Sequence, residues 1–188
     1  MKKTKILCEC AILLALSMVL SYVRVYEAPF GGSVTLLSML PILLAGLKSG
    51  AKWGFGTAFI FAVFQLIQGL SGGNVFPYCY TWQATVICVA FDYVVPFTIL
   101  GLAGLAKGDK LIPWRALAVS AAAIVIRFIC HFITGVVIWG QWAPAGMGKY
   151  LYSLIYNVQY MAPELALTLV GMGLLLASPQ IKRLIEGK

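Results

Sequence analysis

The chain has 188 residues, of which 61% are hydrophobic and 11% are charged, with a mean hydropathy of +0.92 and a formal net charge of +8. A soluble domain is usually about 45–50% apolar and about 25% charged, and a disordered chain is polar and highly charged, so this composition excludes both classes. One bilayer-spanning helix needs about 20 apolar residues, so the length suffices for roughly six spans and no separate soluble domain. We therefore expect residues 1–188 to form one all-α membrane domain.

Charged residues and Gly/Pro clusters separate the apolar stretches and predict six transmembrane helices. The first stretch follows a basic start, as in a secretory signal, but it is longer and no small-residue cleavage site clearly follows it. We therefore expect it to be retained as a span. In chain order, the predicted helices cover residues 6–24, 34–47, 53–70, 82–105, 115–139 and 150–177.

The basic residues indicate the orientation of these helices. If the N-terminus is cytoplasmic, only Arg24 and Lys149 of the 14 Lys and Arg residues lie outside, Arg127 falls within a helix, and the remaining eleven lie in cytoplasmic segments. This asymmetry follows the positive-inside rule, so both termini are predicted to be cytoplasmic. The membrane thus accounts for the positive net charge, and we expect no nucleic-acid partner.

Four ionisable residues lie inside the predicted helices, where a charge is costly and usually faces a partner or a cavity. Asp92 stands beside Tyr93 in the fourth helix, Arg127 and His131 are in the fifth, and Glu164 is in the sixth. A structural interpretation pairs Asp92 with Arg127 and makes Glu164 a tie between helices; we favour such a role for Arg127. For Asp92 we favour a cationic ligand, because a buried carboxylate needs a cation and aromatic faces attract the same ligand.

A second group of candidate residues follows on the fifth helix and across the next loop. His131 and Trp139 lie broadly on one side of the helix, at positions i and i+8. Tyr152 and Asn157 are about 140° apart around an ideal helix, so they share a pocket only if the helix start is irregular or the pocket is wide. The predicted outer loops are rich in aromatic residues, which is typical either of an interfacial belt or of a pocket lining.

Nothing in the sequence resembles a catalytic motif of a hydrolase or metalloprotease, and no phosphate-binding loop occurs. The five cysteines are odd in number and lack paired metal spacing, so we predict no metal site, no cofactor and no catalytic residue. If the protein moves its substrate actively, another subunit must hydrolyse the ATP. Ala11 and Ala15 are small residues four positions apart, a spacing that suits either close approach of a partner helix or internal packing.

Three local segments, together with the length and the six predicted spans, resemble a known family. The chain resembles the substrate-binding S-components of energy-coupling factor (ECF) vitamin transporters, most closely the thiamine-specific ThiT group, over nearly its whole length. The matching segments are Gly31-Gly-Ser-Val-Thr-Leu-Leu-Ser-Met-Leu-Pro41-Ile, Asp92-Tyr93 followed by Gly101-Leu-Ala-Gly104, and His131-Phe-Ile-Thr-Gly135 followed by Trp139 and Tyr152-Ser-Leu-Ile-Tyr-Asn157.

The resemblance implies a high-affinity thiamine pocket near the outer face, built from the fourth to sixth helices and capped by the first outer loop. In it, the carboxylate of Asp92 faces the cationic thiazolium region, with Tyr93 beside it, and Trp139 stacks on the ligand. Polar and stacking contacts are implied for the remaining site residues, which are His131, Tyr152 and Asn157.

The resemblance also implies partners and a location. Ala11 and Ala15 match the motif by which S-components dock on the shared transmembrane coupling subunit, EcfT, and two cytoplasmic ATPases complete an ABC-type importer in the bacterial cell membrane. The chain departs from the ThiT pattern in having Asp92 where a ThiT relative has Glu. Its first outer loop also lacks a Trp, so the capping residue stays open between Tyr26, Glu27 and Phe30.

Two alternatives to a thiamine-binding subunit remain. The first keeps the fold and changes the ligand to another vitamin or a thiamine precursor. The second is a small intramembrane enzyme in which His131 works with Asp92 or Glu164 as acid and base. Binding competition distinguishes the first alternative, and turnover of the ligand distinguishes the second.

Overall fold

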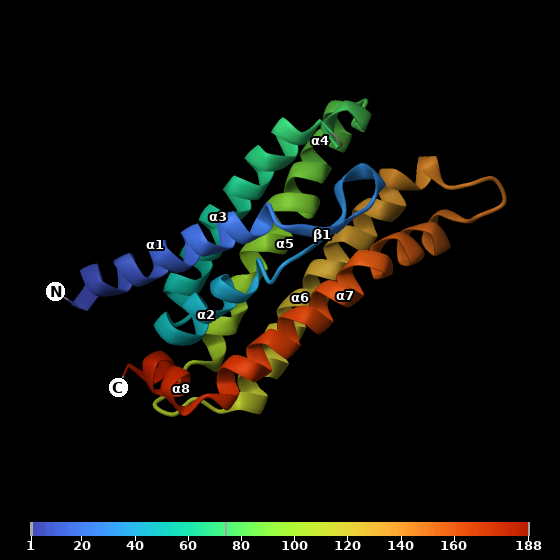
Figure 1. The fold of residues 1–188 in the computed structure, drawn as a ribbon. Helices are drawn as coiled ribbons and strands as arrows, with labels where there is room; N and C mark the ends of the chain where they lie inside the picture. The colour runs from blue at the N-terminus through green and yellow to red at the C-terminus, as the bar shows by residue number, and fades with distance from the viewer. Residues whose placement is uncertain (1, 74, 188) are drawn as a thin grey trace.

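The computed structural model describes residues 2–73 and 75–187, which form a bundle of long helices with one short hairpin (Figure 1). The regular elements are α1 (Lys2–Ser21), β1 (Arg24–Glu27), β2 (Ser33–Thr35), α2 (Leu40–Ser49), α3 (Ala51–Gly72), α4 (Trp82–Cys88), α5 (Val95–Thr98), α6 (Pro113–Val137), α7 (Lys149–Ala177) and α8 (Pro179–Glu186). Short 3-10 helices occupy Pro29–Gly31, Phe76–Tyr78, Ile99–Ala106 and Trp139–Trp142, and a π-helical turn occupies Val89–Val94.

Five helical stretches of the described chain are long and apolar enough to cross a membrane. They coincide with the first, third, fourth, fifth and sixth predicted helices, so the chain is an all-α multi-pass membrane protein, as its composition predicts. The stretches are Lys3–Ser21, Ala51–Gly72, Trp82–Ala106, Pro113–Val137 and Lys149–Ala177.

The second predicted helix, residues 34–47, is shorter in the structure than the sequence indicates. Its first residues belong to strand β2, and the helix that follows, α2, has only 10 residues. At 1.5 Å per residue it spans about 15 Å, roughly half of a bilayer's hydrocarbon core. The physical reason lies in polar Thr35 and Ser38, whose hydroxyl groups bond to one another at 2.6 Å, and in Pro41, which suits the first turn of a helix.

The fourth span is continuous from residue 82 to 106 but irregular inside. The π-helical turn Val89–Val94 carries Asp92 and Tyr93, and the span then tightens into the 3-10 helix Ile99–Ala106. Two glycines let this last segment press against α3: a Cβ on Gly101 would lie 2.6 Å from Cα of Phe55. The π-helical turn in the middle of the span therefore carries Asp92, and the glycine-containing end of the span packs closely against α3.

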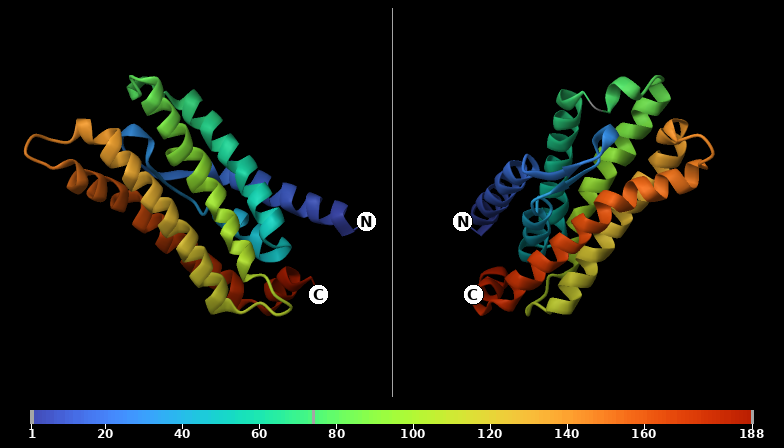
Figure 2. Two further views of the ribbon diagram at one scale, coloured as in Figure 1. Left: turned by 180° about the vertical axis from the view of Figure 1, so that it is seen from behind. Right: turned by 45° about the vertical axis from the view of Figure 1, so that its right-hand side comes forward.

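The helices form two groups with the hairpin between them (Figures 1 and 2). The first group contains α1, α2 and α3, which contact one another, and the second is the pair α6 and α7. The 3-10 segment Ile99–Ala106 touches α2, α3 and α6, and it thereby joins the two groups. Strand β2 pairs antiparallel with β1 and contacts α7. Both termini lie at the end of the bundle away from the α6–α7 loop.

Candidate functional site

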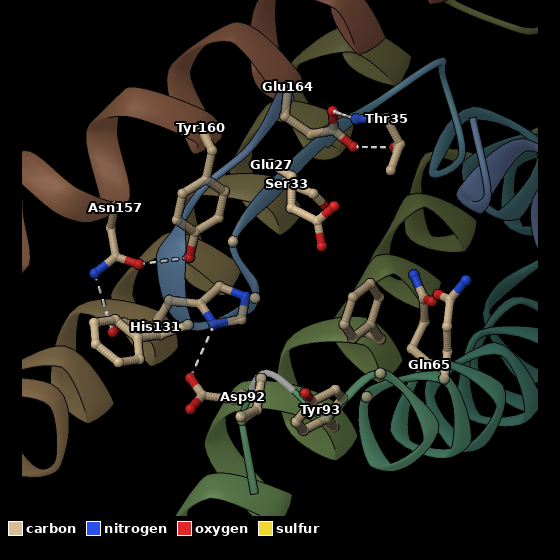
Figure 3. Close-up of a pocket in the computed structure, with 18 of the residues that line it drawn as sticks. Glu27, Ser33, Thr35, Gln65, Asp92, Tyr93, His131, Asn157, Tyr160 and Glu164 are labelled. Atoms are coloured by element: carbon tan, nitrogen blue, oxygen red, sulfur yellow. Dashed lines mark hydrogen bonds and ion pairs between the residues drawn. The ribbon is translucent and has the colours of Figure 1, made fainter. Parts of the chain in front are cut away.

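A pocket lies under the β1–β2 hairpin, enclosed by α3, the π-helical turn, α6 and α7 (Figure 3). Five of the six site residues predicted from the sequence line it, namely Asp92, Tyr93, His131, Trp139 and Asn157. Four further carboxylate- or guanidinium-bearing side chains line the same pocket, namely Arg24, Glu27, Arg127 and Glu164. The pocket is thus a polar chamber within an apolar bundle.

The carboxylate of Asp92 contacts three side chains on one side of the pocket. Its Oδ1 pairs with His131 Nδ1 at 3.1 Å and accepts a hydrogen bond from the Thr134 hydroxyl, while Oδ2 accepts one from Trp139 Nε1 at 3.1 Å. The side chain is 13% exposed. These partners hold the carboxylate of Asp92 in place at the wall of the pocket.

α6 and the 3-10 helix that follows it supply these three partners. His131 and Thr134 lie on one face of α6, Trp139 begins the 3-10 helix Trp139–Trp142, and all three are buried. Gly135 in the same region allows α7 to approach: a Cβ there would lie 2.9 Å from Cβ of Ser153. The Ser153 hydroxyl donates to the Phe132 carbonyl at 2.8 Å, which secures the close contact between the two helices.

Tyr93 lies beside Asp92 in sequence and on another wall of the pocket in space. Its ring stacks on Phe76 with centroids 5.6 Å apart, and it is 9% exposed. The ring reaches α3 because residue 69 is a glycine: a Cβ there would lie 2.7 Å from Cε1 of Tyr93. Tyr93 thus supplies an aromatic wall whose position depends on Gly69.

Asn157 borders the pocket, but its amide is committed to the protein. Its Nδ2 donates to the Ser153 carbonyl at 2.8 Å and to the His131 carbonyl at 3.2 Å, and its Oδ1 accepts from Tyr160 Oη at 2.6 Å (Figure 3). An amide nitrogen has two donor hydrogens, so both are used. Asn157 therefore ties α7 to α6 and orients Tyr160.

Tyr152 is the one predicted site residue that does not line the pocket. Its ring lies 6.0 Å from that of Tyr156, one turn further along α7, and it is half-buried. α7 is regular from its first turn, so Tyr152 and Asn157 face different directions, as ideal helix geometry requires. Instead, Tyr156 and Tyr160 are the tyrosines of α7 that line the pocket, and their spacing from Asn157 could have indicated this.

Glu164 joins α7 to strand β2 rather than to another helix. One carboxylate oxygen accepts from the Thr35 backbone N–H at 2.9 Å, and the other accepts from the Thr35 hydroxyl at 2.6 Å. Glu164 is 2% exposed. The predicted tie therefore exists, but its partner is the hairpin, and the sequence carries no signal for a pairing 129 residues apart.

The tip of the hairpin covers the pocket with an aromatic ring. Phe30 stacks against Trp139 and Trp142, each with centroids 5.7 Å apart, and meets Tyr78 edge-on at 5.1 Å. Its φ of 61° is unusual for a residue other than glycine and turns the ring inward. The hydroxyl of Tyr156 donates to the Pro29 carbonyl and holds the same tip to α7.

These contacts narrow the choice between the three possible capping residues. Phe30 and Glu27 line the pocket, whereas Tyr26 lies outside it and contacts Gln159 at 3.2 Å. Glu27 is paired with Arg24 at 2.5 Å, and its side chain is 42% exposed. The aromatic residues of the predicted outer loops therefore fall into two groups. Phe30 and Trp139 line the pocket, whereas others such as Trp82 are exposed.

α3 contributes two amide side chains to the pocket. Gln65 and Gln68 both line the pocket. The Nε2 atom of Gln68 is buried and has no hydrogen-bond partner among the described residues. A buried amide donor without an acceptor is costly, so this group is well placed to bond to a ligand.

Arg127 departs from the interpretation favoured by the sequence. It forms no ion pair with Asp92 or with any other described residue. The residue is 8% exposed and lines the pocket one helical turn before His131. The carboxylate of Asp92 instead pairs with His131, because the Asp92 side chain lies beside His131 and Thr134 in the last two turns of α6.

The fold and the pocket define a class: a multi-pass, all-α membrane protein with a polar pocket under a hairpin. Residues 7–183 match a family described as thiamine transporter protein (Thia_YuaJ). The match covers nearly the entire chain, and the chain belongs to this family.

Individual relatives agree with the family. The chain is 28% identical to the thiamine transporter ThiT of Lacticaseibacillus paracasei, over 100% of this chain and 94% of that protein. It is 30% identical to the thiamine transporter ThiT of Bacillus subtilis, over 90% of this chain and 88% of that protein. A solved structure of ThiT from Listeria monocytogenes superposes with a TM-score of 0.69 at 22% identity, covering 96% of this chain and 98% of the other, so the fold is shared.

Proposed function

We propose that this protein is the thiamine-binding subunit of an energy-coupling factor importer and captures thiamine in the pocket under the hairpin. Membership of the thiamine transporter family supports thiamine as the ligand. The observation that carries the proposal is the carboxylate of Asp92, which is fixed by three donors and faces a pocket lined with aromatic rings. Thiamine is a permanent cation with two aromatic rings, and this pocket supplies what such a ligand needs.

Each part of the ligand has a suitable group in the pocket. Asp92 neutralises the thiazolium charge, and the faces of Trp139 and Tyr93 add cation–π and stacking contacts of roughly 2 kcal/mol each when desolvated. The Gln68 amide, whose Nε2 has no hydrogen-bond partner among the described residues, suits the polar edge of the aminopyrimidine. Both ring nitrogens of His131 bond to Arg127 and Asp92, so His131 offers the ligand its ring rather than a free polar atom. An affinity of 1 nM needs about −12 kcal/mol, so several of these contacts must act together.

The hairpin has to move for thiamine to stack on Trp139. Phe30 already covers that ring, with the two ring planes at 28° to one another. We infer that the ligand ring displaces Phe30 or slides between the two rings, while Glu164 keeps the far end of strand β2 on α7. Phe30 is then the capping residue. Asn157 acts by positioning Tyr160 and His131, and Tyr152 acts behind Tyr156 rather than on the ligand.

The distribution of basic residues supports a location of the pocket toward the outside of a bacterial plasma membrane. The C-terminal end of α2, the loop between Ala106 and Pro113, and α8 lie at the end of the bundle that holds the termini (Figure 1). These segments carry Lys48, Lys107, Lys110 and Arg183, so this end is cytoplasmic by the positive-inside rule. The hairpin and the pocket lie toward the other end (Figure 1). Both termini are then cytoplasmic, and thiamine binds from outside.

Delivery into the cell requires partners that this chain does not contain. Its sequence lacks a phosphate-binding loop, so two cytoplasmic ATPases supply the energy through the coupling subunit EcfT. Ala11 and Ala15 are exposed on α1, which argues against internal packing and favours their use as a smooth docking surface for a partner helix.

Isothermal titration calorimetry of the detergent-purified protein with thiamine, without ATP, tests the proposal. We expect saturable binding of one thiamine per chain and no binding of riboflavin or biotin. Binding of another vitamin instead would preserve the S-component and replace the ligand. Chemical conversion of thiamine, followed by mass spectrometry, would favour the intramembrane enzyme, and absence of any binding by folded protein would contradict the proposal.

A further inference from the structure

Arg127 is a buried cation whose contacts the thiamine site does not by itself explain. The guanidinium carbon lies 4.2 Å from the centroid of the Phe97 ring, and Nη1 lies 2.7 Å from the sulfur of Met39. These neighbours carry no charge. They hold the flat guanidinium in one orientation, with its Nε–H directed at His131.

The hydrogen bond between Arg127 and His131 determines where the imidazole proton lies. Arg127 Nε donates to His131 Nε2 over 3.3 Å. A guanidinium has no acceptor, so Nε2 must be the acceptor and carries no hydrogen. A neutral imidazole has one N–H, which must therefore sit on Nδ1, and Nδ1 lies 3.1 Å from Asp92 Oδ1.

We infer that Arg127 is a positioning residue: it keeps His131 neutral and protonated on Nδ1, so that His131 orients the Asp92 carboxylate without neutralising it. The order Arg127–His131–Asp92 runs across the pocket from α6 to the π-helical turn. A second proton on His131 would place an N–H against the N–H of Arg127 and bring two positive charges together. It would also pair with Asp92 and remove the negative charge that attracts a cation.

The other groups around the imidazole leave this arrangement in place. Besides Arg127 on its own helix and Asp92 on the π-helical turn, Tyr160 of α7 faces His131, with ring centroids 6.2 Å apart, and its hydroxyl donates to Asn157. Glu27 of the hairpin and Glu164 of α7 border the same pocket, but their hydrogen bonds go to Arg24 and Thr35. Arg127 is thus the donor that opposes protonation of Nε2.

The chain contains one histidine, so protein labelled with 15N-histidine yields the imidazole signals of His131 alone. We expect the wild-type protein to show a pyridine-type Nε2 and a protonated Nδ1 at pH 7.5 and still at pH 5.5. Arg127→Met removes the donor and the charge, and His131 should become doubly protonated at pH 5.5. Arg127→Lys, which keeps a charged donor, should remain neutral, as should the matched control Arg115→Met at the exposed start of the same helix.

Thiamine binding gives a second readout, which rests on the proposed function. We expect the Kd of the wild type to stay within about twofold between pH 7.5 and 5.5, and that of Arg127→Met to rise about tenfold, because an imidazolium then competes for Asp92. A wild-type signal with the proton on Nε2, or a doubly protonated ring at pH 7.5, would overturn the inference. So would an Arg127→Met protein whose imidazole behaves like the wild type. The imidazole signals do not depend on thiamine, so failure of the proposed function would leave this test intact.

Discussion

Replacement of Asp92 by asparagine is the most informative single change in the pocket. The side chain keeps its size, but the negative charge disappears, and one of its two oxygens becomes an NH2 group. That group would face a donor, because both oxygens of Asp92 now accept hydrogen bonds from Trp139, Thr134 or His131. The substitution therefore removes the counter-charge and misdirects one hydrogen bond.

The expected loss follows from the burial of this group, which is 13% exposed. Opposite unit charges about 4 Å apart contribute about 4 kcal/mol at an effective dielectric constant near 20, before the desolvation cost is subtracted. A net loss of about 3 kcal/mol in binding free energy corresponds to roughly a 100-fold rise in Kd, because about 1.4 kcal/mol is tenfold. Aromatic contacts remain, so binding should weaken without disappearing.

Calorimetric titration with thiamine measures this loss directly. Asp109→Asn, in an exposed loop, is the matched control and should leave the Kd unchanged. Thermal melting in detergent confirms that both variants are folded. An Asp92→Asn protein that is folded and binds thiamine within about twofold of the wild type would refute the electrostatic role of Asp92.

Three further substitutions test other parts of the structure. Gly135→Ala should destabilise the protein by about 1–3 kcal/mol through overpacking against α7 and lower its melting temperature, whereas Gly173→Ala, which meets no atom within 4 Å, should not. Glu164→Ala removes the acceptor of the buried Thr35 backbone N–H and one of the two partners of the Thr35 hydroxyl, and should cost about 1–3 kcal/mol of unfolding free energy, while Glu164→Gln, which keeps an acceptor, should cost less. Ala11→Leu, on the exposed side of α1, should leave the thiamine Kd unchanged but abolish thiamine uptake by cells that contain the coupling subunit and ATPases. A loss of binding in that variant would indicate internal packing instead.

Much of the fold follows from the sequence because membrane spans have a strong and simple signal. Long apolar runs between basic residues identified the five long helices to within a few residues. The second predicted helix is an exception. The Thr35 hydroxyl forms hydrogen bonds with the Ser38 hydroxyl and with Glu164, so this stretch need not be helical. The π-helical turn around Asp92 was also not predictable, because helix patterns assume a constant 3.6-residue period.

The sequence indicated which residues belong to the candidate site better than it indicated which of them contact one another. Asp92, His131 and Trp139 stand out as polar or aromatic groups in apolar surroundings, and they do meet in one pocket. The partner of Arg127 depends on the side-chain conformations of Arg127 and His131, which lie one turn apart on α6. No sequence pattern specifies these conformations. Phe30 was one of three possible caps, and neither its stacking on Trp139 nor its left-handed backbone could be read from the sequence.

Tryptophan fluorescence tests the central claim, thiamine capture against Trp139, most directly. Detergent-purified wild-type protein is titrated with thiamine beside Trp139→Phe and the control Trp114→Phe, whose tryptophan is 71% exposed. The account predicts saturable quenching in the wild type and in Trp114→Phe, and loss of most of the signal, with weaker binding, in Trp139→Phe. Folded wild-type protein that shows no response to thiamine, or equal quenching in Trp139→Phe, would contradict it.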